Sequence, residues 1–139
     1  MTRRKGIALL TNLELEVMRV IWAAEARSLR AREVVDAVNE GRERPLAYNT
    51  IQTVLTILKD KGYVRVRPGP GRAHLHSARI GQAEANASMV GDLLSRLFDG
   101  RVEPLLVQLV EDEAIGRSEL EALRRFIDSR LEDDPEGGP

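Results

Sequence analysis

The sequence of 139 residues contains no cysteine. This absence excludes disulfide bonds, thiolate metal sites and cysteine nucleophiles. The chain also lacks any apolar run near the roughly 20 residues that span a membrane. Its basic first residues lead into only a short apolar run at residues 7–10, which is too short for the core of a signal peptide. These absences favour a soluble cytoplasmic protein.

Motifs typical of catalytic sites are missing as well. The sequence has no Gly-rich phosphate loop, no G-x-S-x-G motif and no H-E-x-x-H motif. His74 and His76 would share one face of a strand, and we interpret them either as half of a metal site or as surface residues near a phosphate backbone. The acidic residues 111–113 indicate a solvated helix end more simply than a cation site. We therefore expect no enzyme activity, no metal and no cofactor.

Charge is distributed unevenly along the chain. The net charge is −1, but residues 1–79 contain 15 lysines and arginines against 8 acidic residues, and residues 80–139 contain 6 against 14. A basic segment indicates a polyanionic partner, whereas an acidic segment with helical periodicity is more typical of protein contacts. We expect two regions with different tasks, residues 1–79 and 80–132, followed by a disordered acidic tail at 133–139.

The basic region begins with two predicted helices. Thr11 and Glu14 have the spacing of a capping box, so the first helix is expected at residues 12–24, with Trp22 as a core anchor. A second helix is expected at residues 30–39. Arg30 occupies its N-cap position, where Ser, Thr or Asp usually accepts hydrogen bonds from the first amides. The start of this helix must therefore rely on packing or on a phosphate.

Residues 47–62 are interpreted as a DNA-recognition helix. Its apolar residues recur at the i, i+3, i+4, i+7 spacing of one buried face: Ile51, Val54, Leu55 and Leu58. The opposite face carries short uncharged side chains, namely Asn49, Gln52, Thr53 and Thr56. A helix selected only for solubility usually carries Glu and Lys, whereas these side chains suit hydrogen bonding to base edges in a major groove.

A basic hairpin is predicted directly after this helix. Residues 63–67 and 72–76 form its strands, and Pro and Gly at 68–71 form its turn. The basic residues predicted to contact DNA phosphates are Arg30, Lys59, Lys61, Arg65, Arg67 and Arg72, with Arg3, Arg4 and Lys5 as helpers. A helix followed by a basic hairpin is the winged-helix pattern. The alternative is the same winged helix docking a partner protein instead of DNA.

Three further helices are predicted at residues 82–98, 102–111 and 117–131. Their apolar stripes have too little chain of their own to cover them, so we expect pairing with the same helices of a second copy. The residues predicted at this dimer interface are Leu93, Leu97, Leu105, Leu106, Leu109, Leu120, Leu123, Phe126 and Ile127. The expected fold class is mainly α with a small β-hairpin wing (α+β).

Together these segments resemble the penicillinase-repressor family, which includes β-lactamase, methicillin-resistance and copper-responsive repressors. The resemblance covers about residues 9–131 and is carried by segments 13–18, 21–22, 32–34, 47–55, 61–62, 71–73 and 109–111. It implies a homodimeric winged-helix repressor that binds a promoter dyad of β-lactamase, antibiotic-response or related genes. It also implies release through cleavage by a membrane-bound sensor protease, because the copper branch needs cysteines that this chain lacks.

Several positions depart from the family pattern. Arg30 replaces a capping Thr, Ile57 replaces an Arg, and Asp60 replaces a common basic residue. The family's cleaved bond, Asn-Phe, corresponds here to Gln108 and Leu109. The polar-then-apolar character is kept, and cleavage by a cognate protease is the expected release. A repressor that senses a small molecule directly is the alternative.

Overall fold

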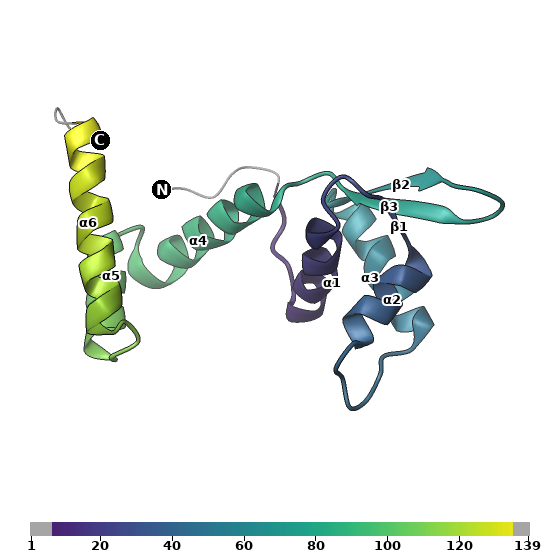
Figure 1. The fold of residues 1–139 in the computed structure, drawn as a ribbon, viewed down its shortest axis with the longest axis horizontal. Coiled ribbons are helices and arrows are strands. Elements are labelled where there is room, and N and C mark those ends of the chain that lie inside the picture. Colours follow the sequence, from purple (N-terminus) through teal and green to yellow (C-terminus); the bar gives the residue numbers. More distant parts are fainter. Residues whose placement is uncertain (1–6, 135–139) are drawn as a thin grey trace. The chain divides into compact units, whose positions relative to one another are not determined.

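The computed structural model describes residues 7–134, which form six helices and one three-stranded antiparallel sheet (Figure 1). The elements are α1 Asn12–Ala23, β1 Leu29–Arg30, α2 Ala31–Asn39, α3 Tyr48–Asp60, β2 Val64–Pro68, β3 His74–Ala78, α4 Gln82–Phe98, α5 Val102–Glu111 and α6 Arg117–Asp133. The chain divides after Leu93 into two compact units. The predicted fold class, mainly α with a small wing, is confirmed.

The first helix begins where the sequence predicted. The Glu14 carboxylate accepts a hydrogen bond from the Thr11 amide at 2.9 Å, and the Thr11 hydroxyl accepts one from the Glu14 amide at 3.3 Å. This reciprocal capping box satisfies two amides that the helix itself cannot. The helix ends at Ala23, one residue earlier than expected.

The second helix begins without a side-chain cap, as expected from Arg30. The Arg30 backbone is extended, and its side chain makes no capping hydrogen bond. The Glu33 carboxylate accepts a hydrogen bond from the Arg30 amide at 3.0 Å, which supplies half of a capping box. The first helical amides therefore donate no hydrogen bond to the N-cap side chain.

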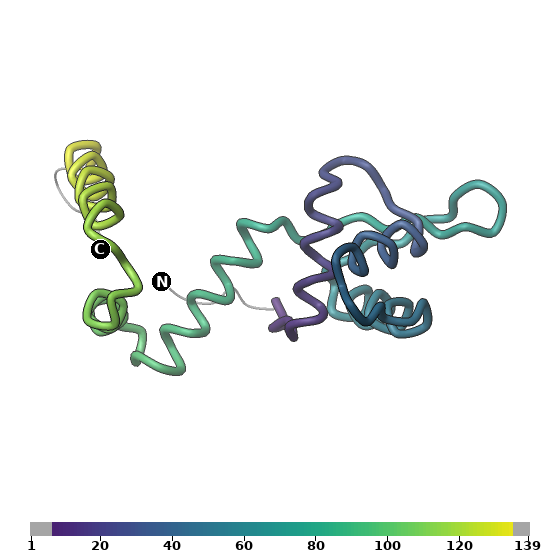
Figure 2. Tube along the Cα trace, turned by 60° about the horizontal axis from the view of Figure 1, so that its bottom comes forward, coloured from purple at the N-terminus to yellow at the C-terminus, as the bar shows by residue number. Residues whose placement is uncertain are grey.

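The sheet contains a strand that the sequence did not reveal. β1 pairs with β3, which pairs with β2, so β3 is the central strand and Leu29 lies opposite His76. The hairpin strands lie one or two residues later than predicted. The turn is closed by a hydrogen bond from the Gly69 amide to the Ala73 carbonyl at 2.8 Å. The hairpin projects beyond the three N-terminal helices (Figures 1 and 2).

One hydrophobic core holds the N-terminal unit together. The predicted stripe of α3 is buried, since its four residues are 0–7% exposed, and it packs with residues of α1, α2 and β2. Trp22 is half-buried, and its indole N–H donates to the Ile80 carbonyl at 2.9 Å. Ala85 of α4 belongs to the same core, and the first half of α4 is part of the N-terminal unit, which extends to Leu93.

The C-terminal unit leaves many of its large apolar side chains exposed. No residue of α5 or α6 is buried within the described chain, and Leu97, Phe126 and Leu131 are each 60% exposed or more. The last helix continues to Asp133, the first residue of the predicted tail. Residues 135–139 of that tail lie outside the described residues. In residues 7–134, no helix is both long and apolar enough to cross a membrane.

Candidate nucleic-acid interface

The polar face of α3 presents the four predicted base-reading residues together. Asn49, Thr53 and Thr56 are exposed, and Gln52 is half-buried. The Thr53 and Thr56 hydroxyls donate to the carbonyls four residues earlier, at 2.9 and 3.1 Å. Since their protons are engaged, the threonines offer methyl groups and oxygen lone pairs to the outside. The amides of Asn49 and Gln52 retain both donors and acceptors, which suits bidentate pairing with a base.

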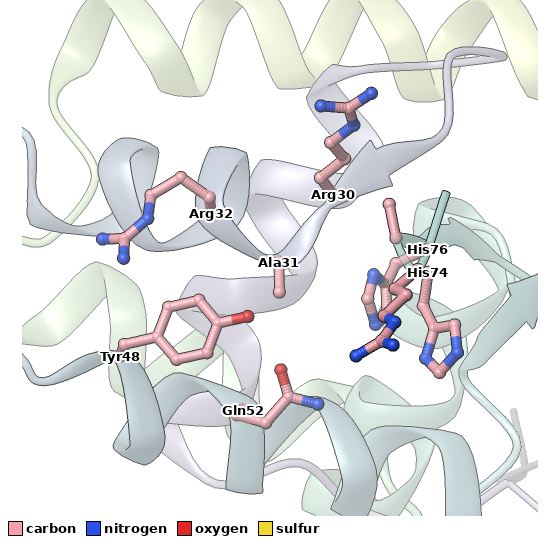
Figure 3. Close-up of a pocket in the computed structure, with 9 residues that line it drawn as sticks. Arg30, Ala31, Arg32, Tyr48, Gln52, His74 and His76 are labelled. Atoms are coloured by element: carbon pink, nitrogen blue, oxygen red, sulfur yellow. The ribbon is translucent and has the colours of Figure 1, made fainter. Parts of the chain in front are cut away.

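A basic hollow lies beside this face, between the start of α2, the start of α3 and the hairpin turn (Figure 3). Its volume is about 390 Å³. It is lined by Arg30, Ala31, Arg32, Tyr48, Gln52, Arg72, Ala73, His74 and His76. These residues include three arginines and two histidines but no carboxylate, so the hollow favours an anion. We call it the basic pocket.

The structure separates the described basic residues that were predicted to contact phosphate into four groups. Arg30 and Arg72 line the basic pocket, and Lys59 lines a smaller hollow beside Gln52 and Thr56. Val66 shares that smaller hollow with α3. Because side chains alternate along a strand, Arg65 and Arg67 of β2 point to the opposite face of the hairpin. Arg3, Arg4 and Lys5 lie outside the described residues.

Lys61 forms the fourth group, because its ammonium is bound inside the unit. It donates to the Glu14 carboxylate at 2.6 Å and to the Leu9 carbonyl at 2.9 Å. The Glu14 side chain is only 7% exposed. Burial alone would raise the pKa of Glu14, but the hydrogen bonds from Lys61 and Thr11 hold that pKa below its ordinary value. Lys61 therefore links α3 to the start of α1 and is not available to DNA in this arrangement.

His76 is buried under the basic pocket, whereas His74 is exposed. The expectation of two surface histidines was therefore wrong for His76. Its Nδ1 lies 3.0 Å from the Leu29 carbonyl. A carbonyl can only accept, so Nδ1 carries the proton and Nε2 has the lone pair in the neutral ring. Burial lowers the pKa of His76, more than this hydrogen bond raises it. The described residues contain no group of three candidate metal ligands.

Arg32 and Tyr48 are polar residues of the basic pocket that were not predicted from the sequence. The guanidinium of Arg32 lies over the ring of Tyr48, 4.9 Å from its centroid. Tyr48 precedes Gln52 by four residues and so shares its helical face. That spacing was a signal available in the sequence. The position of Arg32 was not, because it depends on how α2 crosses α3.

Comparison with known families decides what kind of protein this is. The family model described as penicillinase repressor matches residues 10–129. The chain belongs to the penicillinase-repressor family. This result confirms the resemblance drawn from the sequence motifs, and it places the chain among repressors.

Several relatives in the penicillinase-repressor family cover most of the chain. The penicillinase repressor of Staphylococcus aureus is 25% identical over 114 residues, which are 82% of this chain and 86% of the relative. That of Bacillus licheniformis is 24% identical over 124 residues, 89% and 93% of the two chains. The methicillin resistance regulatory protein MecI of Mammaliicoccus sciuri is 22% identical over 121 residues, 87% and 94%.

A solved structure also resembles part of this chain. It is the solution structure of Bacillus licheniformis BlaI, in its monomeric form, in complex with the blaP half-operator. The match covers 56% of this chain and 89% of that chain, with 29% sequence identity and a TM-score of 0.45.

Proposed function

We propose that this protein is a cytoplasmic transcriptional repressor that binds, as a homodimer, an operator with dyad symmetry. α3 enters the major groove and reads bases through Asn49, Gln52, Thr53 and Thr56. The family relatives, named as repressors of penicillinase and regulators of methicillin resistance, support β-lactamase or related genes as targets. No catalytic step is part of this proposal.

The observation that carries the proposal is the position of the basic pocket next to the uncharged face of α3. Phosphate contacts orient a protein on the duplex, and base contacts supply specificity. Arg30, Gln52 and Arg72 line the same pocket, so a phosphate bound there would place the Gln52 amide at the groove edge. The amides at the start of α2, which lack a side-chain cap, add donors for the same phosphate.

Dimerisation is supported by the exposed apolar residues of the C-terminal unit. Leu97, Leu106, Leu123, Phe126 and Ile127 are between 42% and 65% exposed in the single chain. Monomeric proteins rarely expose so many large apolar side chains on consecutive helices. A two-fold dimer would cover them and would place two copies of α3 about 34 Å apart, in successive major grooves.

Binding of labelled duplexes tests this function. Fluorescence anisotropy should compare DNA from the promoter of its own gene with a random duplex of equal length, over a range of salt concentrations. We expect tighter binding to the promoter DNA and a steep loss of affinity with salt on both duplexes. Salt-insensitive binding to a protein, with no affinity for either duplex, would instead indicate the winged-helix protein-interaction module.

Release by cleavage between Gln108 and Leu109 is the second part of the proposal. Both residues lie in the last turn of α5, and Gln108 donates to the Asp112 carboxylate at 2.8 Å. A protease needs an extended segment, so this turn must open before cleavage. Opening only the end of a helix requires little unfolding, which favours this position over one in the middle of α6. Cutting here would separate α6 from the winged helix and weaken the dimer.

Cells treated with a cell-wall-active antibiotic provide the test of release. Mass spectrometry of the protein should then find fragments ending at Gln108 and beginning at Leu109, in step with derepression. Promoter release with an uncut chain would reject cleavage by a membrane-bound sensor protease and would favour a directly bound effector.

A further inference from the structure

One contact at the edge of the basic pocket suggests a role that the proposed function does not include, although the inference rests on that function. Tyr48 is the first residue of α3, and Arg32 lies near the start of α2. The Arg32 guanidinium carbon is 4.9 Å from the centroid of the Tyr48 ring. The two recognition-side helices therefore meet through a cation–π pair at the mouth of the pocket.

The Tyr48 ring lies between Arg32 and the basic pocket (Figure 3). Arg32 covers one face of the ring from α2, and the hydroxyl points into the pocket beside Ala31 and Gln52 (Figure 3). The Tyr48 residue is 40% exposed, so a ligand can reach it. Within residues 7–134 the hydroxyl has no hydrogen-bond partner. The pocket thus holds an oriented phenolic donor that the fold itself does not use.

The surroundings of the hydroxyl define its acceptor. Arg30, Arg32 and Arg72 line the pocket, and no carboxylate does. None of the three arginines forms a salt bridge within the described chain, although the charge of Arg30 acts on the Glu33 carboxylate outside the pocket. A donor among unpaired cations favours an anionic oxygen acceptor. On duplex DNA the anionic oxygens are those of the backbone phosphates.

We propose that the Tyr48 hydroxyl donates a hydrogen bond to a backbone phosphate of the operator, and that Arg32 is the positioning residue that holds the ring for it. Because Tyr48 and Gln52 lie one turn apart on the same face of α3, this bond fixes how far the helix enters the groove. The phosphate contact thereby sets the distance from the Gln52 amide to the base that it reads.

The test uses the full-length protein and two labelled duplexes, one taken from the footprinted promoter site and one random duplex of equal length. Tyr48→Phe removes only the hydroxyl and keeps the ring. Binding to both duplexes should weaken about tenfold, as for loss of a hydrogen bond to a charged acceptor. The slope of log affinity against log salt should not change, because a phenol carries no charge.

A double-mutant cycle tests the positioning role of Arg32. In an Arg32→Ala background the ring is no longer held, so Tyr48→Phe should weaken binding by much less than tenfold. Tyr63→Phe is the matched control, because the Tyr63 hydroxyl bonds to the Ala8 carbonyl inside the fold. That control should lower the thermal midpoint and leave affinity unchanged. Tyr48→Phe should instead leave the thermal midpoint unchanged and weaken DNA binding.

Three results would contradict the inference. Tyr48→Phe that binds both duplexes as the wild type does would show that the hydroxyl makes no contact. If Tyr48→Phe weakens DNA binding equally in the wild-type and Arg32→Ala backgrounds, Arg32 does not position the ring. If Tyr48→Phe is silent while Gln52→Ala and Arg72→Ala weaken binding, only this inference fails. If the wild-type protein binds neither duplex, the proposed function fails with it.

Discussion

The ammonium of Lys61, at the end of α3, is 2.6 Å from the carboxylate of Glu14, in the first turn of α1. Residues 47 positions apart in the sequence are therefore joined by a largely buried ion pair. Lys61 also bonds to the Leu9 carbonyl, so one side chain holds the N-terminal segment, α1 and α3 together. The pair ties the end of α3 to the start of α1 and does not touch the proposed DNA surface.

Replacing Lys61 should destabilise the fold. Lys61→Met leaves the Glu14 carboxylate buried without its cationic partner, and we expect a loss of about 2 kcal/mol in the free energy of unfolding. Lys59→Met is the matched control, because Lys59 is exposed and has no ion pair within the described chain. Urea unfolding measures both. Equal midpoints for the two variants would show that the Glu14 pair contributes nothing.

The pH dependence of stability should report on His76. Its pKa is lowered by burial from the ordinary value of 6.5, so the unfolded chain binds a proton before the folded one does. Stability should therefore be complete above pH 6.5 and fall as the pH drops below it towards the folded pKa. His76→Asn keeps a donor for the Leu29 carbonyl but cannot titrate, so it should abolish this fall.

His74→Asn is the control for that experiment, since His74 is exposed. It should keep the fall of the unfolding free energy, reduced only by the small part in which the His74 charge lowers the pKa of His76. If stability still falls below pH 6.5 in His76→Asn but no longer falls in His74→Asn, the fall is caused by His74 and not by His76.

Specificity should depend on Gln52 more than on the basic residues. Gln52→Ala removes a bidentate partner for one base and should reduce discrimination at one base pair per half-site by about 1–3 kcal/mol. Binding to random DNA should change little. Affinities for the operator and for all single-base variants of it measure this. Equal losses on operator and random DNA would make Gln52 a structural residue.

The two faces of the hairpin should differ in their contribution to DNA binding. Arg72 lines the basic pocket, whereas Arg65 points to the opposite face of the hairpin. Arg72→Ala should weaken binding to all sequences and flatten the salt slope by about one for each phosphate that is no longer neutralised. Arg65→Ala should change the slope less. With about 6–10 phosphates neutralised per dimer, the wild-type slope should be about −5 to −9. The reverse order of the two variants would place the DNA on the other face.

Dimerisation can be tested without cutting the chain. Phe126 is 62% exposed, so Phe126→Asp should leave the winged helix folded and disrupt the partner contact. Loss of the second linked half-site should weaken operator binding by about 100-fold or more. Arg125→Ala makes the same change in net charge on a different side of α6 and should have little effect. Sedimentation should find the wild type dimeric and Phe126→Asp monomeric at micromolar concentration.

Local patterns predicted most of the helical structure. The capping box of Thr11 and Glu14 and the apolar spacing of α3 each arise from neighbouring residues, and both are found as expected. β1 was missed, because two residues have no periodicity and Leu29 becomes a strand only through pairing with His76. The burial of His76 and the internal pairing of Lys61 were missed for the same reason. Both depend on residues 47 positions away.

In the candidate site, too, features set by neighbouring residues were predicted and features set by distant residues were not. The polar face of α3 could be derived from its spacing alone, since a helix fixes which residues share a side. The basic pocket could not, because it combines Arg32 of α2, Tyr48 of α3 and Arg72 of the hairpin turn. Alternation predicted that Arg65 and Arg67 share a face, but only the packing of Val66 towards α3 shows which face it is.

Footprinting of the full-length protein on the promoter of its own gene and of neighbouring genes tests the central claim most directly. A dimer that places two copies of α3 in successive major grooves should protect two symmetric half-sites about 34 Å apart. Protection should vanish together at both half-sites as salt is raised. A single unpaired half-site, or no salt-sensitive protection at any promoter, would contradict the account of a dimeric operator-binding repressor.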